Sequence, residues 1–515
     1  MSNPQTTINL LSAQTPQRPD NRSILVIGQK IAGTATAGAL VEDIISKEQA
    51  ATSFGQGSMV YKALAAVLDK CSISLVQPKI AAISLADAGG ATAASATLTF
   101  AGTATKAGKI VIYIDSIQRK YELDVAVGAL AADIAASFVA LINADGDRAV
   151  QAGVVGAVIT ITARNAGTQG NTIGTQFDLG LSEGVTLVTT AMAGGATDPA
   201  LTGLFDPIAG KRFTSIVYPA EYGIATLTTE TEARFNVDNK VLDGVGIVGV
   251  TDTYANINTQ VDALNQKTLA YRANKLINNA DYRGGSVFES PLVLAARAAS
   301  IRELRLTVDA NTSSLSPNGQ AQGGSFFGAI PYFNTPEVGL PVIKSGNDFT
   351  DVETEELKNS GAWLLSNNSN NTTLIYDEAV TTYKTNSLGQ VDTTYKYLNY
   401  VDTLTIARDY MFKNIKADFS QSILTSGKLV AGRPMVNAKS FEGTVVGYYA
   451  TLSGFNGDNN YVLLVNSEAA KNQFRDAIRN SIVVNLAEGK ITTDILTSIN
   501  TQLRTILINI TPTFE

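Results

Sequence analysis

The residue types that most catalytic and metal chemistry requires are nearly missing from this sequence. Its 515 residues contain no histidine and a single cysteine, Cys71. Serine–histidine and cysteine–histidine nucleophile pairs therefore cannot form, and neither can metal sites built on histidine or on several cysteines. No intrachain disulfide can form, so nothing here depends on an oxidising compartment. Because Cys71 follows an alanine-rich apolar segment, we expect it to be a small core residue.

Four short motifs resemble binding sites but lack the residues that would complete them. The run Gly28–Gly38 follows an apolar segment, as phosphate loops do, but has neither the lysine–serine ending nor the dinucleotide spacing. Phe54–Ser58 is more typical of a helix entry capped by Ser58. Asn143–Asp147 resembles a calcium-loop fragment without its later oxygen ligands, which favours a simple turn. The acidic cluster Asp348–Glu356 is typical of a solvated helix start. We therefore predict no catalytic residue, no cofactor and no metal site.

Composition limits the class of protein further. Hydrophobic residues make up 45% and charged residues 17% of the chain, which favours well-buried cores over disorder. The formal net charge of −7 gives no basic footprint, so we expect no direct binding of nucleic acid. The polar start, Met1–Asp20, lacks the pattern of a signal peptide, and the longest apolar runs have only strand length. We therefore expect no membrane insertion and a protein made in a cytoplasm.

The elements that would position any site begin with an α/β pattern. The run Ser23–Gly28 predicts a buried strand, the apolar spacing from Met59 to Leu68 predicts a helix, and Ile73–Val76 predicts a second strand. The pattern resumes later with strands at Phe213–Tyr218 and Val245–Val250. A helix is predicted over Thr259–Ile277, and another begins at Ser290-Pro291.

Between these stretches the composition changes abruptly to alanine, glycine and threonine. The segment 87–197 predicts a β-rich domain inserted into the first one, with flexible hinges at Asp87–Gly90 and Met192–Gly195. One helix in it carries Ile134, Phe138, Leu141 and Ile142 on one face. The expected strands are Lys109–Asp115, Lys120–Val127, Val154–Ala163 and Val185–Thr190.

The last third of the chain predicts a loop, two long helices and a terminal strand. Asn311–Asn347 has the composition of a loop, and helices are expected over Asn399–Ser426 and Ser467–Ala487. Near the two ends, Thr7–Leu10 and Thr505–Thr511 alternate like strands. From the residues alone, these strands close the protein's own sheet or pair with a sheet edge of another subunit.

Several motifs, in their order along the chain, resemble the tail sheath family of contractile phages, R-type pyocins and related injection systems. The most specific are Tyr376–Asn386 and Gly389–Leu398, followed by the Val401–Tyr410 helix. The Arg22–Gly28 strand and Phe54–Ser58 correspond to N-terminal markers of that family. The run Val158–Asn165, followed by Gly167 and Gly170-Asn171, is similar to its β-rich domain.

The resemblance implies an α/β fold class with a subtilisin-like core that has none of the protease's chemistry. The implied divisions are an N-terminal arm at 1–20, a core at 21–86 and 198–370, and the inserted domain at 87–197. A C-terminal α+β domain near the inner tube covers 371–495, and a C-terminal arm covers 496–515. The implied function is that of a structural subunit that polymerises helically around an inner tail tube and contracts to drive it through the host envelope.

The resemblance also assigns residues and partners. The arms are expected to exchange strands between subunits through linkers at Ser12–Asp20 and Glu488–Thr493. The arm strands comprise Thr7, Ile8, Asn9, Leu10, Ile506, Leu507, Ile508, Asn509 and Ile510. Tube contact is expected from Lys471, Arg475 and Arg479. The partners are further copies of the chain, the tube protein, and baseplate and tail terminator proteins, in a virion tail assembled in the bacterial host cytoplasm.

Two other classes stay open from the residues themselves. The alanine-, glycine- and threonine-rich insertion also suits a bacterial surface or adhesin-like protein, although the missing secretion signal counts against it. An enzyme that uses carboxylates or lysine is the third class. Tight glycan binding would favour the surface protein, and turnover abolished by a carboxylate substitution would favour the enzyme.

Overall fold

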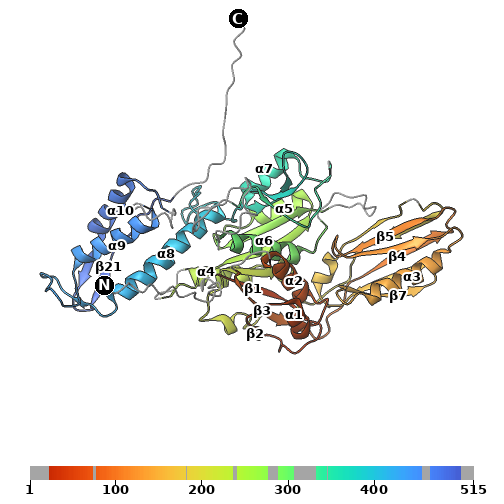
Figure 1. Cartoon of the computed structure of the whole chain (residues 1–515), viewed down its shortest axis with the longest axis horizontal. Coiled ribbons are helices and arrows are strands. Elements are labelled where there is room, and N and C mark those ends of the chain that lie inside the picture. Colours follow the sequence, from red (N-terminus) through yellow and green to blue (C-terminus); the bar gives the residue numbers. More distant parts are fainter. Residues whose placement is uncertain are drawn as a thin grey trace, which may run out of the picture.

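The computed structural model describes residues 22–72, 77–180, 182–235, 240–276, 288–306, 332–344, 346–454 and 464–499. These residues form an elongated molecule with three parts along its long axis (Figure 1). A central α/β part lies between a β-rich part at one end and a helical part at the other, and each contains its own cluster of buried apolar side chains. The mixed α/β class agrees with the sequence prediction.

The central part is built on a seven-stranded sheet. Its strands are β1 (Ser23–Gln29), β2 (Leu40–Val41), β3 (Lys79–Leu85), β11 (Ser215–Pro219), β12 (Val245–Asp252), β13 (Leu269–Lys275) and β15 (Ala362–Trp363). They follow the order β15-β13-β12-β11-β1-β3-β2, and all pairs are parallel except β2 with β3. All seven residues of β1 are buried, as expected for a parallel strand that is covered on both faces.

Helices cover the two faces of this sheet. Two glycines of β12 show how closely the helices approach the strand. A Cβ atom on Gly246 would lie 2.6 Å from the Leu227 side chain of α4 (Ala225–Phe235). A Cβ atom on Gly249 would lie 1.9 Å from the Pro291 carbonyl oxygen of α6 (Pro291–Leu306). Because successive strand residues point to opposite faces, α4 and α6 lie on opposite sides of the sheet. Helix α2 (Met59–Cys71) packs beside α6, and α1 (Lys47–Phe54), α5 (Tyr254–Asp262) and α7 (Asp351–Ser360) complete the layers.

Several sequence predictions for this part are confirmed. Ser58 caps α2 by accepting a hydrogen bond from the Tyr61 amide at 3.3 Å, and α6 begins at Pro291. Cys71 is buried. Helix α7 begins inside the acidic cluster with a capping box between Thr350 and Glu353.

The helix predicted over Thr259–Ile277 is wrong. The structure has α5 ending at Asp262, followed by strand β13 from Leu269. The run Leu269–Ala273 is continuously buried, and periodicity alone cannot distinguish a short buried strand from a buried helix segment. The strand predicted at Ile73–Val76 lies outside the described residues, and the next strand that the structure describes after α2 is β3.

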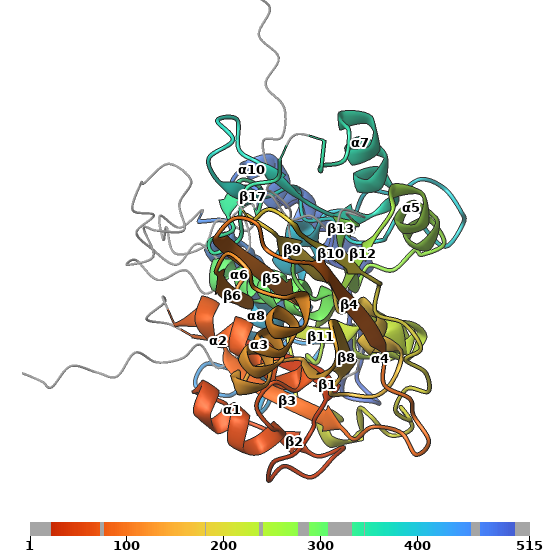
Figure 2. The same ribbon diagram turned by 90° about the vertical axis from the view of Figure 1, so that its right-hand side faces the viewer.

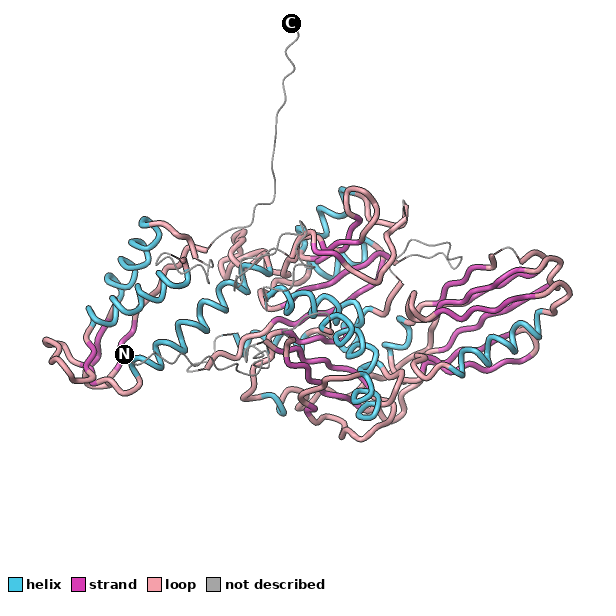
Figure 3. Tube along the Cα trace, viewed as in Figure 1, coloured by secondary structure: helices cyan, strands magenta, loops and turns pink. Residues whose placement is uncertain are grey.

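In its described residues, the inserted part forms two antiparallel sheets. Helix α3 (Ala131–Ala144) packs against strands β4, β6 and β7, and Figures 2 and 3 show the arrangement. The first sheet has the order β10-β4-β8-β7 and the second β6-β5-β9. The strands are β4 (Ser95–Gly102), β5 (Gly108–Ile114), β6 (Lys120–Val125), β7 (Val150–Val155), β8 (Val158–Ala163), β9 (Thr175–Asp178) and β10 (Val185–Thr189). The predicted single strand Val154–Ala163 is a hairpin of β7 and β8, because its alternation continues through a turn at Gly156. Phe138 of α3 stacks on Phe100 at 5.7 Å, whereas Leu141, expected on the same face, is 38% exposed.

The third part contains α8 (Leu398–Phe419), α9 (Ala438–Leu452) and α10 (Glu468–Ser481). Small strand pairs accompany them: β18 (Ile423–Leu424) with β19 (Met435–Val436), and β20 (Val483–Asn485) with β21 (Lys490–Thr492). The central part also contains a three-stranded sheet of β14 (Thr335–Pro336), β17 (Leu374–Tyr376) and β16 (Leu365–Asn367), whose apolar residues belong to its core.

No described helix is long and apolar enough to cross a membrane.

Both long helices end earlier than the sequence predicted. Helix α8 stops at Phe419 rather than Ser426, because Ile423 pairs with Met435 in β19. Helix α10 stops at Ser481 rather than Ala487. The β-branched residues Val483 and Val484 follow the capping residue Ile482 and suit strand β20, which they begin. The expected linker Glu488–Thr493 contains β21, so it is part of a hairpin.

Candidate self-assembly site

The β20–β21 hairpin presents two unpaired strand edges at the end of the helical part. Its register pairs Val483 with Thr492, Val484 with Ile491 and Asn485 with Lys490. Within the described part of the chain, no further strand pairs with either of them. Each outer edge therefore carries backbone N–H and C=O groups that a further strand could bond. Val483 is 60% exposed and Leu486 52% exposed, so the hairpin also offers apolar surface.

A two-stranded hairpin is marginally stable alone, and α10 supplies the support. Ser481 is the last residue of α10. Its hydroxyl oxygen lies 2.9 Å from the hydroxyl oxygen of Thr493 and accepts a hydrogen bond from the Asp494 amide at 2.8 Å. The Thr493 hydroxyl also donates to the Ile478 carbonyl at 3.2 Å. These bonds hold both ends of the hairpin against the end of one helix, so its edges are presented in a fixed place.

The chain leaves the described residues from this same part of the molecule. Leu464 forms an isolated antiparallel bridge with Ile499, and the Val465 amide donates to the Ser498 carbonyl at 3.0 Å. The Val465 carbonyl in turn accepts from the Tyr449 hydroxyl at 2.8 Å, which ties the bridge to α9. The predicted arm residues, Thr7–Leu10 and Ile506–Ile510, lie outside the described residues.

The predicted tube-contact residues form one stripe along α10. Lys471, Arg475 and Arg479 are spaced by four residues, while Ala470, Phe474 and Ile478 face the core. Each cation has a partner in the chain. Arg479 pairs with Glu442 at 2.5 Å, Arg475 donates to Asn472 at 2.6 Å, and Lys471 lies 3.8 Å from Glu468. One member of each ion pair, Glu468 or Arg479, is exposed, and pairs that reach solvent in this way are weak, so these cations can exchange partners for an acidic surface.

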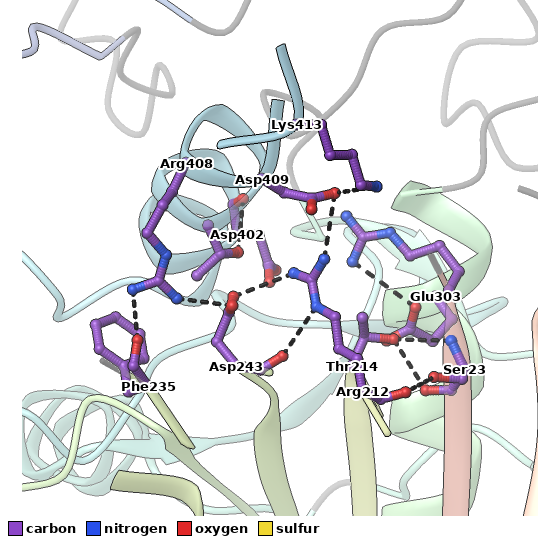
Figure 4. Close-up of polar contacts among 12 residues, drawn as sticks. Ser23, Arg212, Thr214, Phe235, Asp243, Glu303, Asp402, Arg408, Asp409 and Lys413 are labelled. Atoms are coloured by element: carbon purple, nitrogen blue, oxygen red, sulfur yellow. Dashed lines mark hydrogen bonds and ion pairs between the residues drawn. The ribbon is translucent and has the colours of Figure 1, made fainter. Parts of the chain in front are cut away.

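The helical part is joined to the central sheet by buried ion pairs at the base of α8 (Figure 4). Arg302 of α6 pairs with Asp402 of α8, and its guanidinium also donates to the Ser215 hydroxyl at 2.6 Å and to Glu303 at 2.9 Å. Asp402 has no exposed surface. Burial opposes the charge of Arg302, but the facing Asp402 and Glu303 carboxylates outweigh it and raise the pKa of Arg302.

A second set of ion pairs lies about two turns further along α8, at Arg408 and Asp409. Asp243 pairs with Arg212 at 3.1 Å and with Arg408 at 2.7 Å, while Asp409 pairs with Arg212 at 3.3 Å and with Lys413 at 2.9 Å. Figure 4 shows Asp243 between the two arginines. Both sets join α8 to segments that are far away in sequence.

Sequence reasoning missed this junction. The signal was present in α6, where Arg302 and Glu303 lie in a helix rich in alanine and leucine that also carries Arg297 and Arg305. A charge in a helix this rich in apolar residues is at risk of burial and then needs a partner. Nothing in the sequence identified Asp402 as that partner.

Comparison with known proteins shows that the chain is similar to tail sheath proteins. No protein-family model matches the chain. A Mu-like prophage tail sheath protein from Haemophilus influenzae is 23% identical over 445 residues, which are 83% of this chain and 82% of that protein. The solved structure of a sheath tail protein from Listeria innocua matches 88% of both chains at 13% identity, with a TM-score of 0.42. The cryo-EM structure of the anti-feeding prophage baseplate matches all of both chains at 9% identity, with a TM-score of 0.47.

Proposed function

We propose that this chain is a structural subunit of a contractile tail sheath, the family that its sequence relative supports and that its motifs resemble. In this proposal copies of the chain polymerise helically around an inner tail tube and later contract. The observation that carries it is the β20–β21 hairpin, whose two edges are open and whose position is fixed by α10. The role is structural and needs no catalytic residue.

Strand addition is the joint that this hairpin suits. A terminal strand of one copy, Thr505–Thr511 or Thr7–Leu10, pairs with the open edge of β20 or β21 in another copy. The donor and acceptor surfaces differ, so the contact is heterologous and generates a helix rather than a closed ring. Backbone hydrogen bonds then hold neighbouring copies together while the segments that lead to the strands bend.

Contraction requires two packings of the same subunit, with the assembled one held behind a barrier. The stripe of Lys471, Arg475 and Arg479 faces the inner tube in this proposal. Because each of its intrachain ion pairs has one exposed member and is therefore weak, the stripe can bind an acidic tube surface and release it again. In this proposal, baseplate and tail terminator proteins lie at the two ends of the polymer.

The test is negative-stain electron microscopy of the full chain and of two truncations at high concentration. The full chain is expected to form hollow helical tubes. A chain that lacks Thr505–Glu515 should fold and stay in solution without forming tubes. The matched control ends at Thr511, which removes four residues but keeps the predicted strand, and should form tubes like the full chain. Normal tubes from the shorter chain would rule out the C-terminal joint.

The hairpin is tested on the acceptor side in the same way. Val483→Pro removes a backbone N–H from β20 and fixes its backbone, whereas Val483→Thr keeps the N–H and the β-branched shape. Only the proline variant is expected to lose tube formation, with an unchanged circular dichroism spectrum as the check on folding. Equal assembly of both variants would rule out the edge of β20 as acceptor and leave only that of β21.

A further inference from the structure

The two segments that connect the inserted part to the core are paired with each other. The Thr92 amide donates to the Ala196 carbonyl at 3.0 Å, and the Ser95 amide donates to the Ala193 carbonyl at 2.8 Å. The reciprocal bonds, from Ala196 and from Ala193, are also present. The prediction of flexible hinges at Asp87–Gly90 and Met192–Gly195 is therefore wrong for the second segment, because the threonine and alanine neighbours continue a ladder across it.

A loop of the inserted part, Arg164–Thr168, reaches back into the core beside these segments. The Asn165 side chain is buried, and its oxygen accepts the amide of Met59, the first residue of α2, at 3.0 Å. Its amide nitrogen donates to the Lys30 carbonyl at 3.0 Å. The first turn of a helix has amides without helical partners, and here the inserted part satisfies one of them. Asn165 therefore joins α2 and the loop after β1 to the inserted part.

The fully buried side chain of Gln29, the last residue of β1, is bonded on both of its polar atoms. Its nitrogen donates to the Ala166 carbonyl and to the Asp87 carboxylate, each at 2.6 Å. Its oxygen accepts the Tyr222 hydroxyl at 2.7 Å. The Gln29 side chain thus bridges the core sheet, the outgoing segment and the Arg164–Thr168 loop.

Carboxylates on both connecting segments hold the same loop. Asp87 accepts the Ala166 amide at 2.9 Å, and Asp198 accepts the Thr168 amide at 2.8 Å and the Thr168 hydroxyl at 2.6 Å. A second segment of the inserted part, the connection between α3 and β7, is also close to the core backbone, since a Cβ atom on Gly57 would lie 2.4 Å from the Arg148 carbonyl oxygen. Gly57 has a φ of 79°, so glycine meets both the close approach and the backbone conformation.

The β5–β6 turn gives the inserted part a second attachment. Lys62 of α2 pairs with Asp115 at 2.6 Å, and the Ser116 hydroxyl donates to Glu289 at 2.6 Å. The Ile117 amide donates to the Phe288 carbonyl at 2.9 Å. A cavity of about 530 Å³ lies between this turn, α2 and α6. The two attachments contact different parts of the core, one at the end of β1 and the start of α2 and the other at Lys62 and Glu289, so together they resist rotation better than one.

We propose that the Arg164–Thr168 loop is a clip that locks the inserted part to the core, so that the two move as one rigid body. The crevice at the carboxyl ends of parallel strands is where α/β proteins commonly bind ligands. In this chain the clip contacts that edge at the ends of β1 and β3 and the start of α2. The inserted part is consequently a rigid extension of the subunit with a fixed direction, which goes beyond the sheath function proposed above.

The test measures the spread of one distance between the two parts in the full chain. Spin labels are placed at Ala132→Cys in α3 and Ala263→Cys after α5, both exposed, while Cys71 is buried and stays unlabelled. Pulsed dipolar spectroscopy should give a single narrow distance distribution. In the Asn165→Ala background the distribution should become about twofold broader, because the junction opens locally.

The matched control is Asn143→Ala. Asn143 also bonds two backbone groups, the Ala152 amide at 3.1 Å and carbonyl at 2.7 Å, but both lie inside the inserted part. This variant should keep the narrow distribution. Thr168→Val, which removes one hydroxyl bond to Asp198, provides a milder clip variant if Asn165→Ala does not fold. An unchanged width in the clip variants, or equal broadening in the control, would overturn the proposal.

Discussion

The two junctions of the central part use different chemistry. The inserted part is joined mostly through hydrogen bonds, made by Asn165 to backbone groups and by Gln29 and Thr168 to the carboxylates of Asp87 and Asp198, with one ion pair between Lys62 and Asp115. The helical part is joined through buried arginine–carboxylate pairs, such as Arg302 with Asp402. A neutral hydrogen bond to the backbone fixes position at modest cost, whereas a buried ion pair becomes expensive when one partner is lost.

The difference suits the mechanical roles in the proposed sheath. The helical part carries the candidate joint and the tube-facing stripe, so force reaches the core through α8. Ion pairs at two positions about two turns apart on α8 resist sliding of that helix along the sheet. The inserted part carries no candidate joint, and its junction only has to hold a direction. The predictions below each perturb one junction and leave the other unchanged.

The largest effect is expected at the α8 junction. Asp402→Ala leaves the Arg302 guanidinium buried without its main partner and should destabilise the chain by about 3–5 kcal/mol in chemical denaturation. Asp418→Ala on the same helix removes an exposed carboxylate that accepts from Tyr448 and should cost about 1 kcal/mol or less. Similar losses from the two variants would show that the buried pairs do not carry this junction.

The next effect is expected where the inserted part approaches Gly57. Gly57→Ala places a Cβ atom 2.4 Å from the Arg148 carbonyl oxygen and should cost about 2–4 kcal/mol. Gly38→Ala is the control, because Gly38 has the same φ of 79° with nothing within 4 Å of its added Cβ atom. Its cost should be about 1 kcal/mol, from the backbone alone. Equal costs would show that the close approach contributes nothing.

The smallest effect is a pH dependence at the inserted part's second attachment. Burial raises the pKa of Glu289, which accepts from Ser116, to about 7. A carboxyl whose pKa is higher in the folded than in the unfolded state stabilises the fold at low pH, and this contribution is lost as the pH rises towards 7. The glutamine of Glu289→Gln does not titrate, so this variant does not lose that stability as the pH rises. Its free energy of unfolding relative to the parent should therefore rise by about 1–2 kcal/mol between pH 5 and pH 8.

Glu221 has a pKa raised to about 7 by burial as well, so the parent chain alone cannot assign the slope. The comparison is therefore made between Glu289→Gln and Glu221→Gln, with thermal unfolding measured at each pH. If the relative stability of Glu289→Gln does not change with pH, the carboxyl of Glu289 does not titrate at this junction.

The sequence predicted the α/β class and many single elements because these depend on local patterns. The buried run in β1, the Ser58 cap and the Pro291 helix start each depend on a few neighbouring residues. Element ends were harder, since α8 and α10 end where strand partners compete with the helix.

The junctions could not be predicted, because their partners are far apart along the chain. Asn165 and Met59 are 106 residues apart, and Arg302 and Asp402 are 100 residues apart. The motif that contains Asn165 was identified as similar to sheath proteins, but its contact with α2 requires the folded chain. The stripe of cations on α10 followed from helical spacing, and its role in tube contact stays a prediction.

The most direct test of the proposed assembly is a disulfide between two differently marked chains. One chain carries Val483→Cys on the hairpin, and the other carries cysteine at Ile506, Ile508 or Ile510. Because each cysteine is on a different chain and Cys71 is buried, a cross-linked dimer reports strand addition between copies. We expect that dimer on a non-reducing gel for one of the three positions, and none when Val155→Cys, exposed on the inserted part, replaces Val483→Cys. No dimer from the mixture, together with an internal disulfide when both cysteines are on one chain, would contradict assembly by strand exchange.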